Sequence, residues 1–489
     1  MTLRLHSLIA SPAALAACLA GWAATNESTA QEAAPAGRTT AVEWVQTIQG
    51  PASGESGVAM AVEAGGAIFI AGHHGGLDTD GDGAIDVAAD GTDPLFLKVS
   101  PDGKVLWIRA PMAPGYNAGS GIALDGQGGA YGTGSFQDRL SFGSAHVLRG
   151  GGNSDGFLAR YDAEGELLWV RAVAGGGNQS MLGISSDRAG NAYVAGFGGG
   201  SFTFEEEGDL FEARGKAAAF VASYDPRGRL RWARVSGTPA ASYARTIAVA
   251  PDGHVIVAGD ATDGPVDLDG DGREDLPPRK GQLGFVARFS PEGRLAGAWP
   301  IASAGSVLFT GIAFANDGDL VVSGTLTAPA DFDADGTPDA EVRSGGATSA
   351  FLARYAPAGT LRWVRSYTMD GAWNVASDGK RFVVSGFVRG PRDLDENGTV
   401  ERHAADAKRD SDLAVLILSE EGRPLDVWIA PGRGNDHARA AAFVPGQPAV
   451  YVTGFLQLTA DFTGEGENAG RWIRCDALGD LFLARYRLR

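Results

Sequence analysis

Four stretches of the sequence carry acidic side chains at one shared spacing, with a glycine at the sixth position of each. Oxygen ligands at positions one, three and five of a tightly curled loop converge on one point, and a carboxylate at position nine completes the shell. Oxygen ligands in such numbers favour Ca²⁺ over Mg²⁺ or Zn²⁺. The predicted calcium ligands are Asp78, Asp80, Asp82 and Asp86; Asp267, Asp269, Asp271 and Asp275; Asp331, Asp333, Asp335 and Asp339; and Asp393, Asp395, Asn397 and Glu401.

The alternative interpretation of these stretches is a set of solvated turns, because Asp and Gly favour turns in any case. Four copies of one pattern favour cation binding instead. Several converging carboxylates with no nearby base would repel one another in the absence of a cation. We therefore expect Ca²⁺ to order these loops rather than to perform chemistry.

The elements that position the acidic loops are copies of one unit. A tryptophan recurs at intervals of 62 to 67 positions, as Trp44, Trp107, Trp169, Trp232, Trp299, Trp363 and Trp428. A period of this length fits one four-stranded propeller blade with a long loop. We expect the tryptophans, at one blade position in every copy, to fill the gaps between neighbouring blades rather than to bind a ligand.

Each copy is expected to contain two β-hairpins. In residues 157–169 an alternating apolar strand leads through a glycine turn into the strand that carries the tryptophan. Residues 247–259 show the second hairpin, with a Pro-Asp-Gly turn. Because consecutive strands are antiparallel, the short turns lie on one face of the molecule and the long loops on the other. Recognition is expected on the long-loop face.

The two ends of the chain complete each other. The last copy, residues 482–486, lacks a tryptophan strand, and residues 42–48 supply one at the other terminus. The sequence therefore predicts an all-β fold, a seven-bladed β-propeller over residues 39–489, closed by pairing of an N-terminal strand with the C-terminal blade. Such pairing also removes an exposed sheet edge.

The N-terminal region has the features of an export signal. Residues 1–24 are predicted to be a signal peptide and residues 25–38 a flexible linker. Leu15-Ala-Ala-Cys18 resembles a bacterial lipobox, which makes Cys18 the candidate lipidation site; ordinary cleavage after Ala23 or Ala30 is the alternative. The expected location is the cell surface, as an outer-membrane lipoprotein, or the extracellular space, with membrane contact only through the lipid.

The net charge and the motif content exclude several functions. A formal charge of −18 argues against nucleic acid as a partner. No HExxH motif, nucleophile elbow or phosphate loop is present, and the pair His73–His74 is disfavoured as a zinc site. Polar and aromatic residues just before the inner strands form a candidate ligand face, namely Tyr116, Asn117, Asn178, Gln179, Tyr243, Trp373, Asn374, Asp436 and His437.

The repeated hairpins, for example Phe157-Leu-Ala-Arg-Tyr followed by Gly-Glu-Leu-Leu-Trp169, resemble the bacterial seven-bladed β-propeller repeat family. The acidic loops resemble the calcium loops of integrin-type propellers. The first resemblance implies a secreted or surface protein with a binding role, and it carries over no catalytic residue.

Three functions remain. The expected one is a calcium-stabilised, non-catalytic binding or scaffold module, with an unknown protein or glycan at the loop face. The alternative is a carbohydrate-binding or polysaccharide-degrading propeller. A quinoprotein ranks last: Gly-x-Leu-x-Trp resembles quinone-dependent dehydrogenase repeats, but those enzymes often carry an adjacent cysteine pair and have eight blades, whereas here Cys18 and Cys475 are far apart.

Overall fold

The computed structural model describes residues 40–50, 54–79, 82, 84–205, 208–343, 347–400, 410–462, 472–475 and 479–488. Within them all regular structure is β-strand and no helix is found, so none of sufficient length and hydropathy to cross a membrane is present in this part of the chain. The predicted signal peptide and linker, Cys18, Asp80 and Glu401 lie outside the described residues.

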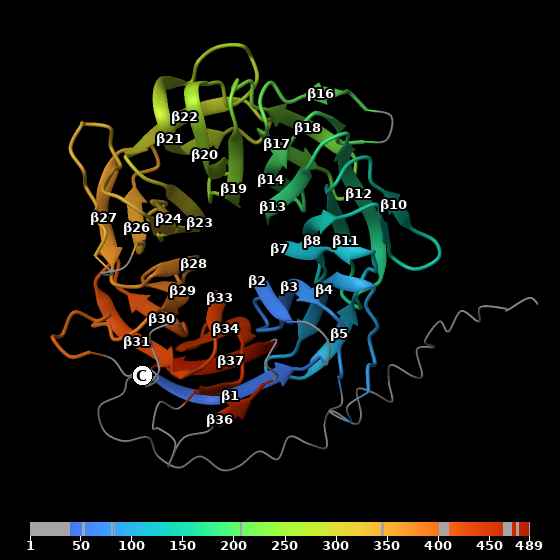
Figure 1. Cartoon of the computed structure of the whole chain (residues 1–489), viewed down its shortest axis with the longest axis vertical. Coiled ribbons are helices and arrows are strands. Elements are labelled where there is room, and N and C mark those ends of the chain that lie inside the picture. The colour runs from blue at the N-terminus through green and yellow to red at the C-terminus, as the bar shows by residue number, and fades with distance from the viewer. Residues whose placement is uncertain are drawn as a thin grey trace, which may run out of the picture.

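The long strands form sets of four antiparallel strands that are arranged around a common axis, some of them extended by short strands, and the chain is an all-β propeller (Figure 1). The sheets formed first along the chain contain β2 (Ser56–Val62), β3 (Ile68–His74), β4 (Gly91–Val99) and β5 (Val105–Arg109); β7 (Ala118–Leu124), β8 (Ala130–Phe136), β11 (Asp155–Tyr161) and β12 (Leu167–Gly175); β13 (Gln179–Ser186), β14 (Ala192–Gly198), β17 (Ala218–Tyr224) and β18 (Leu230–Val235); and β19 (Ser242–Val249), β20 (Val255–Val266), β21 (Leu276–Phe289) and β22 (Leu295–Ser303).

The later sheets contain β23 (Val307–Phe314), β24 (Leu320–Leu326), β26 (Ser349–Tyr355) and β27 (Leu361–Tyr367); β28 (Gly371–Ser377), β29 (Phe382–Val388), β30 (Asp412–Leu418) and β31 (Pro424–Ala430); and β33 (His437–Phe443), β34 (Ala449–Leu456), β37 (Asp480–Leu488) and β1 (Thr40–Ile48). Short strands form in the long connections, namely β6 (Gly115–Tyr116), β9 (Arg139–Ser141), β10 (Val147–Arg149), β15 (Ser201–Thr203), β16 (Phe211–Glu212), β25 (Ala330–Asp331), β32 (Gly432–Arg433), β35 (Thr459–Asp461) and β36 (Trp472–Arg474).

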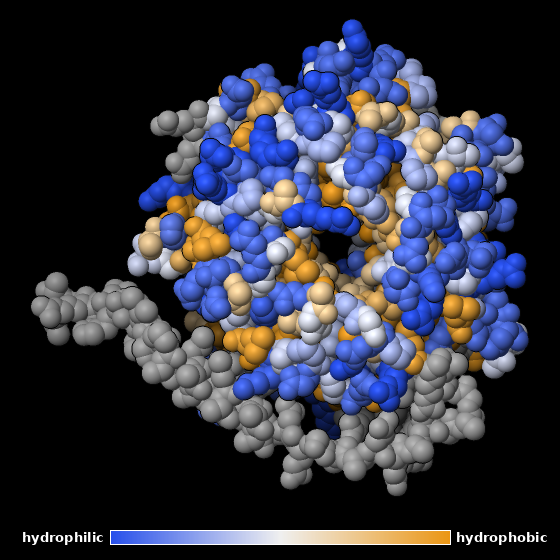
Figure 2. Space-filling view, turned by 180° about the vertical axis from the view of Figure 1, so that it is seen from behind, coloured by the Kyte–Doolittle hydropathy of each residue, from blue (hydrophilic) through white to orange (hydrophobic). Residues whose placement is uncertain are grey.

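The two ends of the chain meet in one sheet. β1 pairs antiparallel with β37, from Thr40 opposite Leu488 to Ile48 opposite Leu481. The first strands of successive sheets contact one another in chain order, and β33 of the last sheet contacts β2 of the first. Seen from the side opposite to Figure 1, the side chains leave an opening near the middle of this ring of inner strands (Figure 2).

Each inner strand contains one β-bulge at the same register position. Between β2 and β3, for example, Gly57 lies opposite Gly72 and Ala59 opposite Ala71, which leaves Val58 as the extra residue. A bulge twists the strand and changes the direction of a side chain. The extra residues of the other inner strands are Ser120, Leu182, Arg245, Thr310, Trp373 and Arg439.

The recurring tryptophans join neighbouring sheets. The indole nitrogen of Trp107 donates to the carbonyl of Ala163, in the turn between β11 and β12 of the next sheet, at 3.1 Å. Trp169 and Trp232 make the corresponding bonds to Pro226 and Pro291, at 3.0 Å and 2.9 Å. These indoles pack between sheets, as expected.

The prediction that all the tryptophans occupy one blade position was wrong for two of them. Trp107 lies opposite Lys98 in the ladder, and Gly297 holds the equivalent place opposite Arg288. Trp299 is therefore two residues further along β22, and Trp428 is displaced in the same way along β31. A shift of two residues keeps a side chain on the same face of a strand, so Trp299 still contacts the turn of the next sheet at Gly359.

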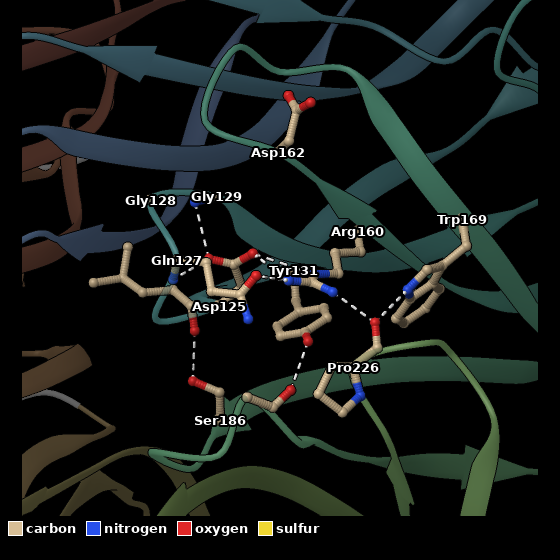
Figure 3. A network of polar contacts seen from close by, with 12 residues as sticks. Asp125, Gln127, Gly128, Gly129, Tyr131, Arg160, Asp162, Trp169, Ser186 and Pro226 are labelled. Carbon is tan, nitrogen blue, oxygen red and sulfur yellow. Dashed lines mark hydrogen bonds and ion pairs between the residues drawn. The ribbon is translucent and has the colours of Figure 1, made fainter.

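Buried ion pairs secure the short-turn face (Figure 3). Arg160 in β11 lies 2.8 Å from Asp125, which follows β7, and its guanidinium also donates to the carbonyl of Pro226 in the next sheet at 2.6 Å. Arg354 makes the same kind of link, to Asp319 in its own sheet at 2.9 Å and to the carbonyl of Glu420 in the next at 2.9 Å. This face is cross-linked, so the long loops on the opposite face are freer to carry function.

Candidate functional site

All four acidic loops follow the second strand of their sheet, on the long-loop face. Residues 78–86 connect β3 to β4, 267–275 connect β20 to β21, 331–339 lie between β24 and β26, and 393–401 follow β29. This is the arrangement that the repeat predicts, with each loop held between two strands of a rigid sheet.

The first residue of each acidic loop also contacts the preceding sheet. The carbonyl of Asp267 accepts bonds from the Ser236 hydroxyl at 2.6 Å and the Gly237 amide at 3.0 Å, both just after β18. The Asp78 amide donates to the Gln49 carbonyl beside β1 at 2.9 Å. Asp331 pairs with Ala302 in β22, and the Thr368 hydroxyl, just after β27, donates to the Asp393 carbonyl at 2.9 Å. Each loop is therefore a junction between two sheets.

The loop 267–275 brings three carboxylates together. Oxygens of Asp267, Asp269 and Asp275 lie within 4.8 Å of one another, a spacing suited to one shared cation. The Asp267 carboxylate is nearly buried and accepts from the amides of Gly270 at 2.7 Å and Gly272 at 3.0 Å. These bonds fix the orientation of the carboxylate at the first position of the loop.

The loop 331–339 repeats this geometry in the next sheet. Oxygens of Asp331, Asp333 and Asp339 also lie within 4.8 Å of one another. Asp331 accepts from the Gly336 amide at 2.9 Å through Oδ2, whereas its Oδ1 is buried and has no hydrogen-bond partner in the described part of the protein. An unpartnered carboxylate oxygen at the first ligand position is the arrangement that a cation would satisfy.

The carboxylates at position five accept hydrogen bonds from the loop backbone. Asp271 accepts from the Arg273 amide at 2.8 Å and Asp335 from the Thr337 amide at 2.7 Å. Neither belongs to the converging groups, so of the predicted ligands the structure brings together positions one, three and nine. In both of these loops the Oδ2 atom of the aspartate at position nine accepts from the amide at position two. The Leu268 amide donates to Asp275 at 2.6 Å, and the Phe332 amide donates to Asp339 at 2.7 Å.

The two remaining acidic loops share parts of this pattern. Asp86 accepts from the Thr79 amide at 2.8 Å, as at position nine of the other loops, and Asp82 accepts from the Ala84 amide at 2.7 Å. In the fourth loop Asp393 accepts from the Gly398 amide at 2.8 Å. One predicted ligand of each, Asp80 or Glu401, lies outside the described residues, and Asp78, Asp395 and Asn397 are the other members of these predicted sets.

In the three acidic loops whose fourth and sixth positions are described, both of these positions are left-handed, and the sequence indicated only the sixth. The glycine at position six has φ of +89° at Gly272, +95° at Gly336 and +84° at Gly398. Position four is left-handed as well, with Gly270 at +77°, Ala334 at +61° and Glu396 at +60°. Because a Cβ is disfavoured in this region, Ala334 and Glu396 carry backbone strain inside candidate metal loops.

Burial and neighbouring carboxylates disfavour the ionised form of the carboxyl at position nine. Burial raises the pKa of Asp275; the Leu268 amide opposes this, and the charges of Asp269, Asp267 and Asp271 raise it further. The pKa of Asp339 is raised for the same reasons, with Asp333, Asp331 and Asp335 as neighbours. A divalent cation at either group would reverse the Coulomb contribution and favour the ionised forms.

The candidate ligand face divides into buried and accessible residues. Asn117, Gln179 and Asp436 are fully buried and bond to the loop backbone, so their side chains present no accessible surface to a ligand. Asn117 Oδ1 accepts from the Gln137 amide at 2.7 Å, Gln179 Nε2 donates to Gly199 at 2.8 Å, and Asp436 Oδ1 accepts from the Gln457 amide at 2.7 Å. Tyr116 and Asn178 are exposed, while Tyr243, Trp373, Asn374 and His437 are partly exposed.

Two of the partly exposed residues, Trp373 and His437, belong to a cluster that also contains residues not singled out in the sequence. The His437 ring stacks on Phe387, with centroids 4.3 Å apart and planes at 16°, and lies 6.0 Å from Trp373. The guanidinium of Arg439 lies 4.0 Å from the Trp373 ring centroid. Trp373 and Arg439 are both bulge residues. No sequence pattern marks the bulge, which is why the repeat does not single out Arg439.

Two histidines of this region are held neutral. Burial, followed by the charge of Arg439, lowers the pKa of His73 to about 4. Burial, followed by Arg439 and Arg389, lowers the pKa of His437 to about 3. The His73 ring lies 6.3 Å from that of Tyr116. His74 points elsewhere, because its Nδ1 accepts from the Gly76 amide at 3.2 Å.

Buried aspartates at the start of third strands form another set that the sequence did not indicate. Asp93 accepts from the amides of Ala113 at 2.8 Å and Asp90 at 2.9 Å, and Asp155 from Gly175 at 3.0 Å and Gly151 at 3.1 Å. Burial raises the pKa of both carboxyls. They tie loops to strands, and no group of three metal-binding side chains forms around either of them in the described residues.

Comparison with known proteins places the chain in no family. No family model matches it. An alignment over 150 positions, which covers 28% of the chain, is 29% identical to an uncharacterised WD repeat-containing protein of Acanthamoeba polyphaga mimivirus, and the match spans only 11% of that protein.

Several solved structures are similar at low sequence identity. One is a catalytically inactive virginiamycin B lyase from Staphylococcus aureus with quinupristin (TM-score 0.43, 9% identity, 91% of this chain and 99% of that chain covered). Another is the polysaccharide lyase Uly1, with a TM-score of 0.41 and 10% identity, where 88% of this chain and 90% of that chain are covered. A third is the Swd1 β-propeller domain of Myceliophteria thermophila, with a TM-score of 0.30 and 10% identity, where 71% of this chain and 93% of that chain are covered. The activities in these names belong to those proteins, and the propeller fold of this chain rests on its own sheets.

Proposed function

We propose that this chain is a closed seven-bladed β-propeller that acts as a calcium-stabilised, non-catalytic binding or scaffold module. Seven four-stranded sets, the β1–β37 pairing and the contact between β33 and β2 support a closed ring. The export signal in the sequence supports placement at the cell surface or outside the cell, with Cys18 as lipid anchor. The partner, a protein or a glycan, binds on the long-loop face.

The observation that carries the calcium proposal is the double convergence of carboxylates in successive sheets. Asp267, Asp269 and Asp275, and then Asp331, Asp333 and Asp339, form groups of the same shape at the same blade position. Carboxylates with a glycine-rich backbone suit Ca²⁺, which accepts irregular oxygen shells, better than Mg²⁺, which demands octahedral geometry and keeps its waters. The first residue of each loop also bonds to the preceding sheet. A bound ion would therefore stabilise the contact between sheets.

The test is thermal unfolding of the full chain in excess EGTA and in a series of Ca²⁺ concentrations. A ligand that binds only the native state stabilises it by about 2.7 kcal/mol per site at one hundred times its dissociation constant. We expect the Tm to rise with Ca²⁺ and not with equal concentrations of Mg²⁺. Identical melting curves in EGTA and saturating Ca²⁺ would refute the calcium part of the proposal.

A further inference from the structure

The guanidinium of Arg439 has no acidic partner among the residues that the structure describes. It is partly buried, and its Nε is fully buried without a hydrogen-bond partner in the described part of the protein. Its contacts are with aromatic faces, at 4.0 Å from the Trp373 centroid and 5.6 Å from that of Phe455. Burial lowers the pKa of Arg439, and the Tyr116 hydroxyl opposes this shift. A desolvated cation without a counter-charge is costly.

The equivalent residue of another sheet shows how this position is satisfied internally. Arg245 is the bulge residue of β19 and lies 4.5 Å above the Tyr243 ring, much as Arg439 lies over Trp373. Arg245, however, pairs with Asp260 at 2.6 Å. Asp260 faces Tyr243 across the ladder, and the residue in the same place opposite His437 is Phe455. The last sheet keeps the arginine and replaces its carboxylate by a phenyl ring.

Two more unpartnered polar atoms accompany Arg439. The indole nitrogen of Trp373 is a buried donor with no acceptor among the described residues, and His437 Nδ1 is buried and unpartnered. The Ser411 hydroxyl donates to Asn435 at 3.0 Å, so it accepts from His437 Nε2–H, 2.9 Å away. Because the low pKa keeps this ring neutral, Nδ1 is left as an acceptor.

The three groups define a complementary ligand. Arg439 and Trp373 offer donors to an anion, and a guanidinium matches a carboxylate through two parallel bonds. His437 Nδ1 can accept a hydrogen bond from a hydroxyl of the ligand. Tyr116, 65% exposed and 6.3 Å from the His73 ring, adds an aromatic face at the rim, of the kind that packs against a sugar ring. β28, β33 and β2, with β3 beside β2, are neighbours around the opening (Figure 1).

We propose that Arg439, Trp373 and His437 bind an acidic carbohydrate, with the carboxylate on Arg439 and Trp373 and an adjacent hydroxyl on His437. This inference rests on the proposed role of the chain as a binding module and names its ligand class. The acid is a hydroxylated carboxylate, free or as a uronic residue within a polysaccharide.

The test is isothermal titration of the full chain, in saturating Ca²⁺, with glucuronic acid, a glucuronic-acid-containing oligosaccharide and glucose. We expect both acidic probes to bind and glucose not to bind. Stronger binding of the oligosaccharide than of the monosaccharide identifies a polymer as the source of the carboxylate, and equal binding identifies the free acid. Equal binding of glucose and glucuronic acid, or binding of none of the three, overturns the proposal.

Variants separate a lost ligand contact from a lost fold. Arg439→Gln should weaken acidic probes by about tenfold or more, since it removes a charged hydrogen bond. The matched control Arg245→Gln should leave affinity unchanged, because that arginine already has its carboxylate. Phe455→Asp should place an internal carboxylate beside Arg439 and compete with the ligand while the melting curve stays cooperative. Full affinity in Arg439→Gln or Phe455→Asp overturns the proposal.

A calcium-loop variant distinguishes the two proposals. Asp331→Asn is expected to lose calcium stabilisation and to keep binding to acidic probes at a temperature where it is folded. If the chain ignores Ca²⁺ and still binds glucuronic acid, the calcium proposal fails alone. If Ca²⁺ stabilises the chain and no acidic probe binds, the present inference fails alone.

Discussion

Arg160 and Asp125 form an ion pair at 2.8 Å with side chains only 8% and 2% exposed. The pair lies on the short-turn face, and Arg160 continues to the Pro226 carbonyl of the next sheet. One guanidinium therefore links two strands of its own sheet and a turn of its neighbour. Since a buried charge is destabilising when its partner is removed, this face should respond sharply to substitution.

Replacing Arg160 by Met is expected to lower the free energy of unfolding by about 3–5 kcal/mol, because Asp125 is then buried and unpaired. Urea unfolding followed by circular dichroism measures the change. The control is Arg229→Met, which breaks the exposed pair with Asp225 and should cost no more than about 1 kcal/mol. Equal losses of unfolding free energy in the two variants would mean that the buried network stabilises the protein no more than the exposed pair does.

Replacing Asp275 by Asn should have opposite effects with and without calcium. In EGTA the variant should melt at a higher temperature than the wild type, because burial and three neighbouring carboxylates disfavour the charge of Asp275. In saturating Ca²⁺ it should melt at a lower temperature, because a ligand is lost and with it up to about 2.7 kcal/mol. Thermal scans of both proteins in both buffers measure this crossing. Glu164→Gln, an exposed acid outside the loops, is the control and should shift neither curve.

Ala334 and Gly270 occupy the same loop position with φ of +61° and +77°. Ala334→Gly removes a Cβ from a left-handed residue and should stabilise the protein by up to about 1 kcal/mol, net of the greater flexibility of the unfolded chain. Gly270→Ala should destabilise it, because the new Cβ also meets the Val235 carbonyl. Chemical unfolding of both variants tests the pair, and the same sign for both would contradict the strain described at this position.

Asp436 should make stability fall as the pH rises. Burial, together with Asp412 and Asp410, holds the pKa of this carboxyl well above its ordinary value, against the Gln457 amide. Between the ordinary pKa and the raised one, the native state keeps a proton that the unfolded chain has lost, so each pH unit costs up to about 1.4 kcal/mol. Asp436→Asn should remove this part of the slope and be the more stable protein at pH 8. Parallel stability profiles of variant and wild type from pH 4 to 8 would contradict this assignment.

The sequence predicted the hairpins and the pairing partners of the termini because glycine turns and alternating strands are local signals. It placed Trp299 and Trp428 in the wrong register, since moving a residue two places along a strand does not change the face it occupies. The pairing of Trp44 with Arg485, between β1 and β37, needed no local signal beyond the missing strand in the last copy.

The sites were harder to predict than the fold. Loop spacing found the carboxylates of Asp267 and Asp331, but not that position-five acids bond to the backbone. Asn117 and Asp436 look like exposed loop residues in a sequence, whereas tertiary contacts bury them. The sequence pattern did not indicate Arg439 for another reason. The feature that distinguishes this arginine is that Phe455 stands at the position where an acid would pair with it.

The pairing of β1 with β37 has a consequence for the order in which the protein can fold during synthesis. β1 precedes the other described strands along the chain, and its partner β37 follows all of them, so the pair can form only after every other sheet has been synthesised. Until then both β1 and the free edge of β34 present unpaired backbone groups, which are templates for intermolecular strand pairing. A chain truncated before β37 is therefore expected to expose two sheet edges and to aggregate, rather than to behave as a slightly shortened functional protein.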